Sequence, residues 1–185
     1  MNIRLLLVLL MMWGTLAVGV CQDYAPKPGE TDIKLVIENK GTIWIKLHTK
    51  EAPKTTARII ELVSQHFYDG QKFYRVLKTP KPFLIQTGDP MSRHRDVSDR
   101  SLGQNGTGQF IPYENSGFSN LKGAVGLSSL PTDRDKGDSQ FFILLDDHPF
   151  LDGNYTVFGQ VVFGMSVVNG IELGDRIASA TIVRG

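Results

Sequence analysis

The feature of the sequence that most constrains the fold is a series of short apolar runs separated by Gly, Pro, Asp and Asn residues. Apolar and polar side chains alternate over residues 33–37 and again over residues 43–47, and Asn39 to Gly41 between them has turn composition, so we expect a β-hairpin. Further apolar runs cover residues 73–77, 83–85, 124–127, 141–145, 157–162 and 179–183. Many short strands favour a closed β-barrel, because closure removes the exposed strand edges.

Two segments have the periodicity of a helix instead. Pro53 suits the first turn of a helix, and apolar residues follow at the three-to-four-residue spacing of one helical face: Ile59, Ile60, Val63 and Phe67. We expect Asp69-Gly70 to end this helix and residues 167–171 to form a second, shorter one.

The composition is that of one globular domain. The chain has 185 residues, of which 41% are hydrophobic and 21% are charged. Its formal net charge is +1, and its basic residues are interspersed with acidic ones. Because no Lys/Arg-rich block is present that could bind phosphates, we expect no nucleic-acid partner.

The first 21 residues differ from the rest and are interpreted as an export signal. Residues 5–20 carry no charge and are somewhat short for a membrane-spanning helix. The small residues Ala17 and Gly19 would allow cleavage before Val20, with cleavage near Cys21 or an uncleaved anchor as alternatives. We therefore expect an exported protein, periplasmic or secreted.

Cys21 is the only cysteine and stands at the end of this signal, where bacterial lipoproteins carry an acylated cysteine. Val20 before it is larger than such signals prefer, so Cys21 is a candidate for lipidation beside a simply processed N-terminus. Membrane attachment would run through this lipid or through an uncleaved signal. A single cysteine excludes an intramolecular disulfide. Residues 22–31 are interpreted as a linker and residues 32–185 as the folded domain.

Metal and hydrolase chemistry have little support. The histidines are scattered and far from the cysteine, so we expect no metal site at His48, His66, His94 or His148. Ser139, His148 and Asp152 could be assembled into a catalytic triad, but Ser139 lacks the context of a nucleophile elbow. We therefore rank a hydrolase low.

A set of short motifs resembles the cyclophilins, in the order in which that family carries them. The segments are Phe67-Tyr68-Asp69-Gly70, Phe73-Tyr74-Arg75-Val76, Gln86-Thr87-Gly88-Asp89, Gly106-Thr107-Gly108, Ser139-Gln140-Phe141-Phe142-Ile143, Leu151-Asp152-Gly153 and Val157-Phe158-Gly159. The set is far more specific than any single motif. The resemblance covers roughly residues 32–184 and implies a mainly β fold, a closed eight-stranded antiparallel barrel capped by two helices.

The resemblance also implies a site. Arg75 matches the catalytic arginine, and Gln86 would orient it or the substrate. The positions that match the substrate groove are Tyr74, Phe83, Leu84, Leu130, Pro131, Gln140, Phe142, Phe150, Leu151 and Tyr155. An arginine among aromatic residues in a strand is costly unless it is used or paired, so Arg75 resists a purely structural interpretation best.

Several positions depart from the commonest pattern of the family. Tyr74 stands where histidine is usual, and Phe150 and Tyr155 replace tryptophan and histidine in a way that resembles bacterial, exported members. The connection over residues 78–82 is longer than usual. Pro131 has no N–H, so one contact to the substrate backbone would be missing or supplied by a neighbour.

The function that the resemblance implies is peptidyl-prolyl cis-trans isomerisation of flexible, proline-containing polypeptides, assisting the folding of exported proteins. We expect a monomer that needs no cofactor, and weak binding of cyclosporin-type inhibitors, because Phe150 lacks an indole N–H. The alternative is a proline-binding module or holdase chaperone with little turnover, motivated by Pro131 and Tyr74.

Overall fold

The computed structural model describes residues 24–130 and 132–185. Its strands are β1 (Thr31–Ile37), β2 (Gly41–Leu47), β3 (Arg75–Leu77), β4 (Leu84–Thr87), β5 (Ala124–Leu127), β6 (Phe141–Leu144), β7 (Val157–Phe163) and β8 (Ile177–Arg184). Its α-helices are α1 (Pro53–Ser64) and α2 (Met165–Gly170), and single 3-10 turns lie at Pro90–Arg93, Arg134–Lys136 and Pro149–Leu151. The predicted signal at residues 1–21 and the candidate lipidation of Cys21 lie outside the described residues.

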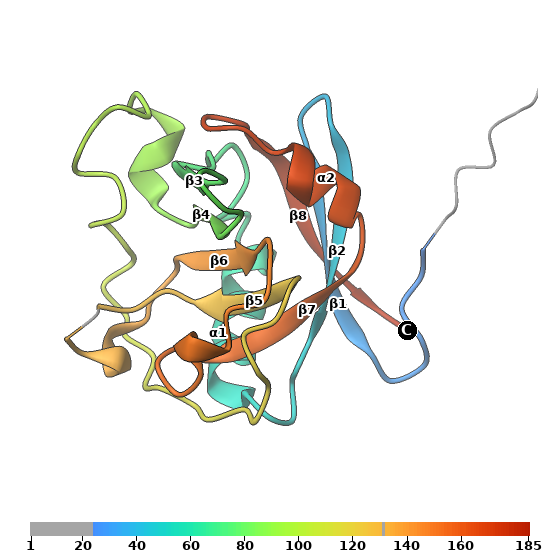
Figure 1. The fold of residues 1–185 in the computed structure, drawn as a ribbon. Coiled ribbons are helices and arrows are strands. Elements are labelled where there is room, and N and C mark those ends of the chain that lie inside the picture. The colour runs from blue at the N-terminus through green and yellow to red at the C-terminus, as the bar shows by residue number, and fades with distance from the viewer. Residues whose placement is uncertain (1–23, 131) are drawn as a thin grey trace, which may run out of the picture.

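The strands form one antiparallel sheet in the order β3-β4-β6-β5-β7-β2-β1-β8. The sheet curls into a half-barrel, with β3 to β6 on one side and β1, β2 and β8 on the other (Figure 1). The predicted hairpin is confirmed: β1 pairs with β2, and Asn39 in the turn has φ 58°, a left-handed conformation that asparagine tolerates. No helix in the described ranges is long and apolar enough to cross a membrane.

The prediction of a closed barrel is wrong, because β3 and β8 remain the two edges of the sheet. Between them the described residues form an isolated bridge, Lys72 with Arg176, in place of a continuous ladder. Backbone hydrogen bonds from Phe73 N to Asp175 O and from Ile177 N to Gln71 O tie the neighbouring loops together. The physical reason is that β3 is only 3 residues long, so the chain that approaches β8 is a loop.

The helices cover the sheet, α1 against β8 and α2 against β2. Helix α1 starts at Pro53 as expected but ends at Ser64, before the Asp69-Gly70 turn, because His66 adopts a left-handed conformation with φ 57°. Its first turn is capped by a side chain that lies far away in the sequence. The Glu114 carboxylate accepts hydrogen bonds from Lys54 N at 3.0 Å and Thr55 N at 2.7 Å. A carboxylate stabilises the positive end of the helix dipole there.

The apolar side chains separate into two clusters. The larger lies between the concave face of the sheet and the helices, and includes Ile45, Ile59 and Phe141. The smaller cluster lies on the opposite face of β4, β5 and β6 and consists of Leu84, Ala124, Phe142, Leu144 and Val157. Strand alternation explains the division, because successive side chains point to opposite faces. The second cluster is the floor of the site described next.

Candidate active site

Arg75 is the first residue of β3 and lies directly opposite Gln86 on β4. The pairing brings their side chains together, and Arg75 Nη1 donates to Gln86 Oε1 at 3.1 Å. The Arg75 side chain is exposed, whereas Gln86 is buried. A buried amide therefore holds one corner of an accessible guanidinium, whose other donors can reach a ligand.

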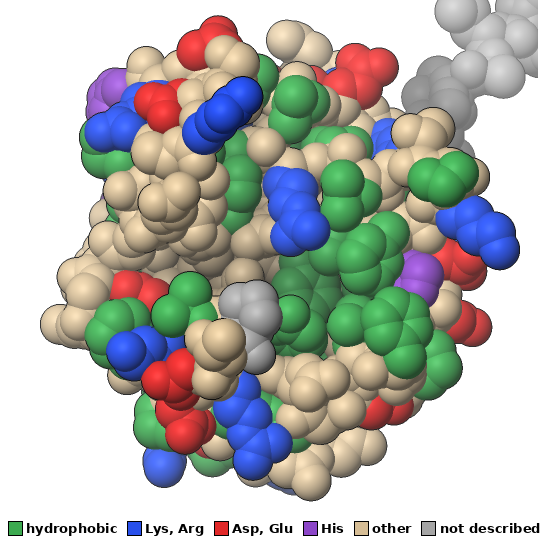
Figure 2. Space-filling model, turned by 60° about the vertical axis from the view of Figure 1, so that its left-hand side comes forward, with side chains coloured by type: hydrophobic (Ala, Val, Ile, Leu, Met, Phe, Trp, Pro, Cys, Tyr) green, Lys and Arg blue, Asp and Glu red, His purple; other side chains and the backbone are tan. Residues whose placement is uncertain are grey.

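A cavity of about 80 Å³ opens beside this pair. Its lining combines apolar and polar side chains and consists of Arg75, Phe83, Leu84, Gln86, Ser128, Phe142, Leu151 and Tyr155. The face of the molecule that comes forward from the β3 to β6 side shows apolar side chains gathered beside a hollow (Figure 2). A small apolar cavity with a few convergent donors is typical of a ligand site.

The floor of the cavity depends on one glycine. Gly126 on β5 pairs with Phe142 on β6, and the Phe142 ring lies over the glycine. A Cβ added at Gly126 would lie 2.7 Å from Phe142 Cε2 and 2.8 Å from Phe142 Cε1, closer than real contacts allow. Tyr155 meets the same ring edge-on at 5.3 Å. The ring is thus held between a bare strand and an aromatic side chain.

Behind the cavity lies a chain of amide hydrogen bonds. Gln86 Nε2 donates to Gln140 Oε1 at 3.2 Å and to Ser128 Oγ at 3.0 Å. The Tyr74 hydroxyl donates to the same Gln140 oxygen, and Gln140 Nε2 donates to the Asn105 carbonyl at 2.7 Å. Burial, and then the charge of Asp89, raise the pKa of Tyr74 well above its ordinary value. The tyrosine therefore stays protonated and can donate.

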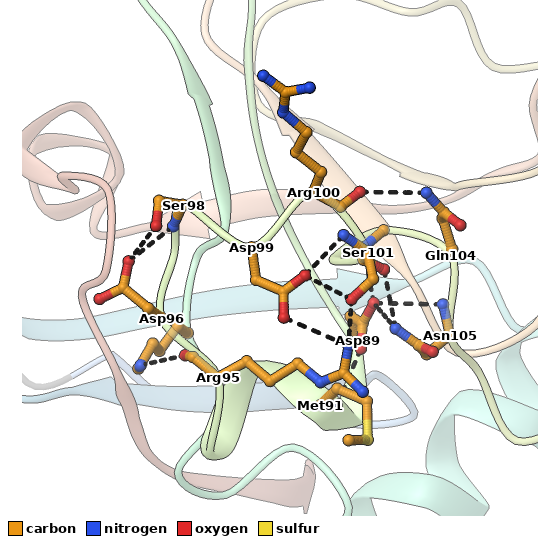
Figure 3. A network of polar contacts seen from close by, with 12 residues as sticks. Asp89, Met91, Arg95, Asp96, Ser98, Asp99, Arg100, Ser101, Gln104 and Asn105 are labelled. Carbon is orange, nitrogen blue, oxygen red and sulfur yellow. Dashed lines mark hydrogen bonds and ion pairs between the residues drawn. The ribbon is translucent and has the colours of Figure 1, made fainter.

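The Asn105 carbonyl belongs to a loop that is organised around the buried carboxylate of Asp89 (Figure 3). Asp89 Oδ2 accepts from Gly103 N at 2.6 Å and from Asn105 Nδ2 at 3.0 Å, while its Oδ1 accepts from Met91 N at 2.9 Å. Asn105 Nδ2 also reaches the Ser101 carbonyl at 2.9 Å. Hydrogen bonds to a carboxylate are stronger than neutral ones, so this segment is well fixed.

A family comparison decides what this arrangement belongs to. The model of the family described as "Cyclophilin type peptidyl-prolyl cis-trans isomerase/CLD" matches residues 33–183. The chain belongs to this cyclophilin-type family. A relative named probable peptidyl-prolyl cis-trans isomerase, from Brucella suis biovar 1, is 32% identical over 170 residues, covering 90% of this chain and 84% of the relative. The peptidyl-prolyl cis-trans isomerase of Synechococcus elongatus is 37% identical over 146 residues, covering 78% of this chain and 91% of the relative.

Solved structures agree in fold. A cyclophilin-type peptidyl-prolyl cis-trans isomerase of Cryptosporidium parvum superposes with a TM-score of 0.72 at 21% identity, covering 84% of this chain and 99% of that one. The crystal structure of that protein in the presence of the dipeptide Ala-Pro has a TM-score of 0.67 at 22% identity, with 83% and 98% coverage. The family match and the named relatives confirm the cyclophilin resemblance of the sequence, and these structures agree with it in fold.

Most of the positions matched to the cyclophilin site meet around one groove. Arg75, Gln86, Phe83, Leu84, Phe142, Leu151 and Tyr155 line the same cavity. Gln140 lines a neighbouring cavity of about 220 Å³, which Leu130 also borders. Phe150 is 69% exposed at the rim, where its ring stacks on Phe83 at 6.3 Å. Tyr74 is buried behind the groove, and Pro131 lies outside the described residues.

The triad considered above is not assembled. Ser139 Oγ is buried and donates to the Gly88 carbonyl, while the His148 ring contacts the Pro82 carbonyl at 3.2 Å. The Asp152 carboxylate instead accepts from Ser119 and Asn120. Each of these side chains has a separate structural partner. In the part of the chain that the structure describes, no three His, Cys, Asp or Glu side chains gather as a metal site.

Two residues of the site were not found from the sequence. Ser128 bonds Gln86 and lines the cavity, and the Asn105 main chain bonds Gln140. Neither has a signal of its own, because a serine after a strand and a main-chain carbonyl in a loop are ubiquitous. Asp89 stands in one of the quoted motifs, Gln86-Thr87-Gly88-Asp89, but no role was predicted for it from the sequence.

Proposed function

We propose that this protein accelerates rotation about X-Pro peptide bonds in flexible segments of exported polypeptides. The observation that carries the proposal is the exposed Arg75 guanidinium, anchored by Gln86 at the edge of an apolar cavity. The cavity suits a proline ring, and the guanidinium suits the peptide group that precedes it. The relatives named peptidyl-prolyl cis-trans isomerase support this assignment.

The chemistry requires no bond to break. A planar peptide bond resists rotation with a barrier of ~18–20 kcal/mol, because resonance gives it partial double-bond character. In the twisted transition state the nitrogen regains a lone pair, which can accept a hydrogen bond that the planar amide cannot. Arg75 is the donor in this proposal, since a guanidinium is always protonated and presents a rigid fork of N–H groups. No nucleophile or cofactor has a step to perform.

Substrate binding and rate acceleration then fall to different side chains. Phe83, Leu84, Phe142 and Leu151 would bury the proline ring and bind ground and transition states alike. Only the Arg75 contact strengthens as the bond twists, so it carries the acceleration. The Cryptosporidium parvum structure obtained in the presence of Ala-Pro supports a proline-containing ligand for this groove.

The direct test is a protease-coupled isomerisation assay on an X-Pro peptide, with the purified chain and its Arg75→Ala variant. Acceleration by the wild type that is largely lost in Arg75→Ala is expected. Calorimetric binding of the peptide without any acceleration would replace the proposal by the alternative, a proline-binding module or holdase.

We also propose that the protein acts outside the cytoplasm, because residues 5–20 form an uncharged apolar run. Intact-mass measurement of the mature protein tests this. Loss of the first 19 to 21 residues is expected, and an added diacylglyceryl mass would place a lipid on Cys21. A cytoplasmic protein that retains Met1 would exclude export.

A further inference from the structure

Tyr74 has no part in the mechanism described so far, yet it ends a hydrogen-bond chain that reaches Arg75. Its side chain is only 9% exposed, and its hydroxyl points to Gln140 Oε1. The ring is confined as well, because a Cβ at Gly103 would lie 3.2 Å from Tyr74 Cε2. A tyrosine placed in this way can orient its neighbours but has little surface to offer a substrate.

The Asn105 carbonyl fixes the donor and acceptor directions of these hydrogen bonds. The Asn105 carbonyl can only accept, so the Gln140 NH₂ group must face it, at 2.7 Å, and Gln140 Oε1 must face the other way. Gln86 Nε2 donates to that oxygen, which leaves Gln86 Oε1 for Arg75. A reversed Gln140 would place two NH₂ groups against each other. Each amide therefore has one satisfied orientation.

The loop that supplies the Asn105 carbonyl is itself immobilised. Asp89 holds both the main-chain and side-chain nitrogens of Asn105, at 3.3 and 3.0 Å. Arg95 pairs with Asp99 at 3.3 Å in the part of the loop that precedes Asn105 (Figure 3). Gln140 is thus held between a fixed carbonyl on one side and the Tyr74 hydroxyl on the other.

We propose that Tyr74 is a positioning residue for Arg75, acting through Gln140 and Gln86. Without the hydroxyl, Gln140 Oε1 keeps one donor instead of two, and the Gln86 amide that anchors the guanidinium gains freedom. Arg75 would then spend less time aimed at the peptide nitrogen. The catalytic consequence rests on the isomerase function proposed above, whereas the structural link does not.

Tyr74→Phe removes only the hydroxyl and is the first test. We expect kcat to fall about twofold to tenfold, the range of one neutral hydrogen bond, with KM changed by less than about twofold. Tyr68→Phe is the matched control, because it removes a buried tyrosine hydroxyl that bonds the Ser139 carbonyl at 2.9 Å, one residue before Gln140. It should lower stability similarly but leave kcat unchanged. Equal kcat losses in the two variants would overturn the proposal.

A double-mutant cycle separates action through Arg75 from general loosening. In an Arg75→Ala background the further change Tyr74→Phe should have no effect on kcat, since the positioned group is gone. The same fold-loss in both backgrounds would show that Tyr74 acts independently of Arg75.

A third measurement needs no isomerase activity. By ¹⁵N NMR, rotation of the Arg75 guanidinium about Nε–Cζ should be faster in Tyr74→Phe, and in Gln140→Met, which breaks the next link, than in wild type or Tyr68→Phe. Unchanged rotation in Tyr74→Phe or in Gln140→Met would contradict the link. This result stands even if the wild type does not accelerate X-Pro rotation.

Discussion

Phe141 and Phe142 are neighbours on β6 and are almost equally buried, 2% and 3% exposed, yet they belong to different parts of the molecule. Phe141 meets Tyr68 and Phe158 edge-on at 5.4 and 6.2 Å in the main core. Phe142 points the other way and lines the proposed proline pocket. Burial alone therefore does not distinguish a residue that holds the fold from one that shapes the site, whereas the partners of each side chain do.

The two faces of these strands also differ in composition. The inner face of β4 to β6 is mostly apolar, with Ile85 and Ile143 packed into the main cluster. The outer face places Gln86 between apolar neighbours and turns its amide toward Arg75. Substitutions on the inner face should lower stability, and those on the outer face should lower turnover.

The largest effect should come from Phe141→Ala. Emptying a core site of this size typically lowers the free energy of unfolding by about 3–5 kcal/mol, through lost transfer energy and a cavity. Urea denaturation measures the loss. Isomerase activity per folded molecule should stay close to wild type, and a specific loss of activity would break the division between the faces.

Arg75→Ala should lower activity and leave stability almost unchanged, the reverse of Phe141→Ala. Removing a single donor to a transition state commonly costs about 10²–10³-fold in rate, and we expect kcat/KM to fall by about 10²-fold. The free energy of unfolding should change by less than about 0.5 kcal/mol, because the side chain is exposed. Arg75→Lys should recover only part of the rate, since a point charge lacks the planar fork. Near-normal turnover in folded Arg75→Ala protein would remove Arg75 from its role.

Phe142→Leu should show a smaller and mixed effect. The pocket keeps an apolar floor but loses ring area, so KM should rise several-fold while kcat changes little. The loss of stability should be about 1–2 kcal/mol, less than for Phe141→Ala. Steady-state kinetics and denaturation on the same preparation give both numbers. A fall in kcat at unchanged KM would show that Phe142 acts on Arg75 and not on the proline ring.

Phe150→Trp should have the smallest effect. The added indole N–H offers one hydrogen bond at the exposed rim, worth about 0.5–1.5 kcal/mol net, so a cyclosporin-type inhibitor should bind about twofold to tenfold more tightly. Calorimetry measures the affinity, and peptide turnover should change less. Unchanged inhibitor affinity would show that residue 150 does not line the inhibitor site.

The sequence predicted individual strands and the hairpin better than it predicted whether the sheet closes into a barrel. Alternation over residues 33–37 and 43–47 gave the β1–β2 hairpin correctly, because each strand has one buried face. The closed barrel failed at β3, where the run over residues 73–77 forms a strand only from Arg75 to Leu77. Closure depends on whether two distant edges are long enough to pair, and no local pattern carries that information.

The site was accessible from the sequence only through its motifs. Register explains why Arg75 meets Gln86, but the register of β3 with β4 depends on the long loop between them, which periodicity does not fix. The Ser128 and Asn105 contacts depend on loop positions in three dimensions. Tyr74 directly precedes β3, and its buried side chain bonds Gln140 and does not line the cavity, which its place in the motif did not reveal.

At Gly126 the intrinsic strand preference of the residue and the shape of the proposed proline pocket make opposite demands. Glycine inside a strand costs roughly 0.5–1 kcal/mol relative to alanine, and alanine is one base substitution away from glycine in the genetic code. A methyl group there would drive the Phe142 ring into the space proposed for proline. Alanine at position 126 would therefore gain intrinsic strand preference but displace a ring that lines the cavity. The weaker strand preference of glycine is therefore the local cost of keeping the Phe142 ring where it lines the cavity, a stability–activity trade-off at one carbon atom.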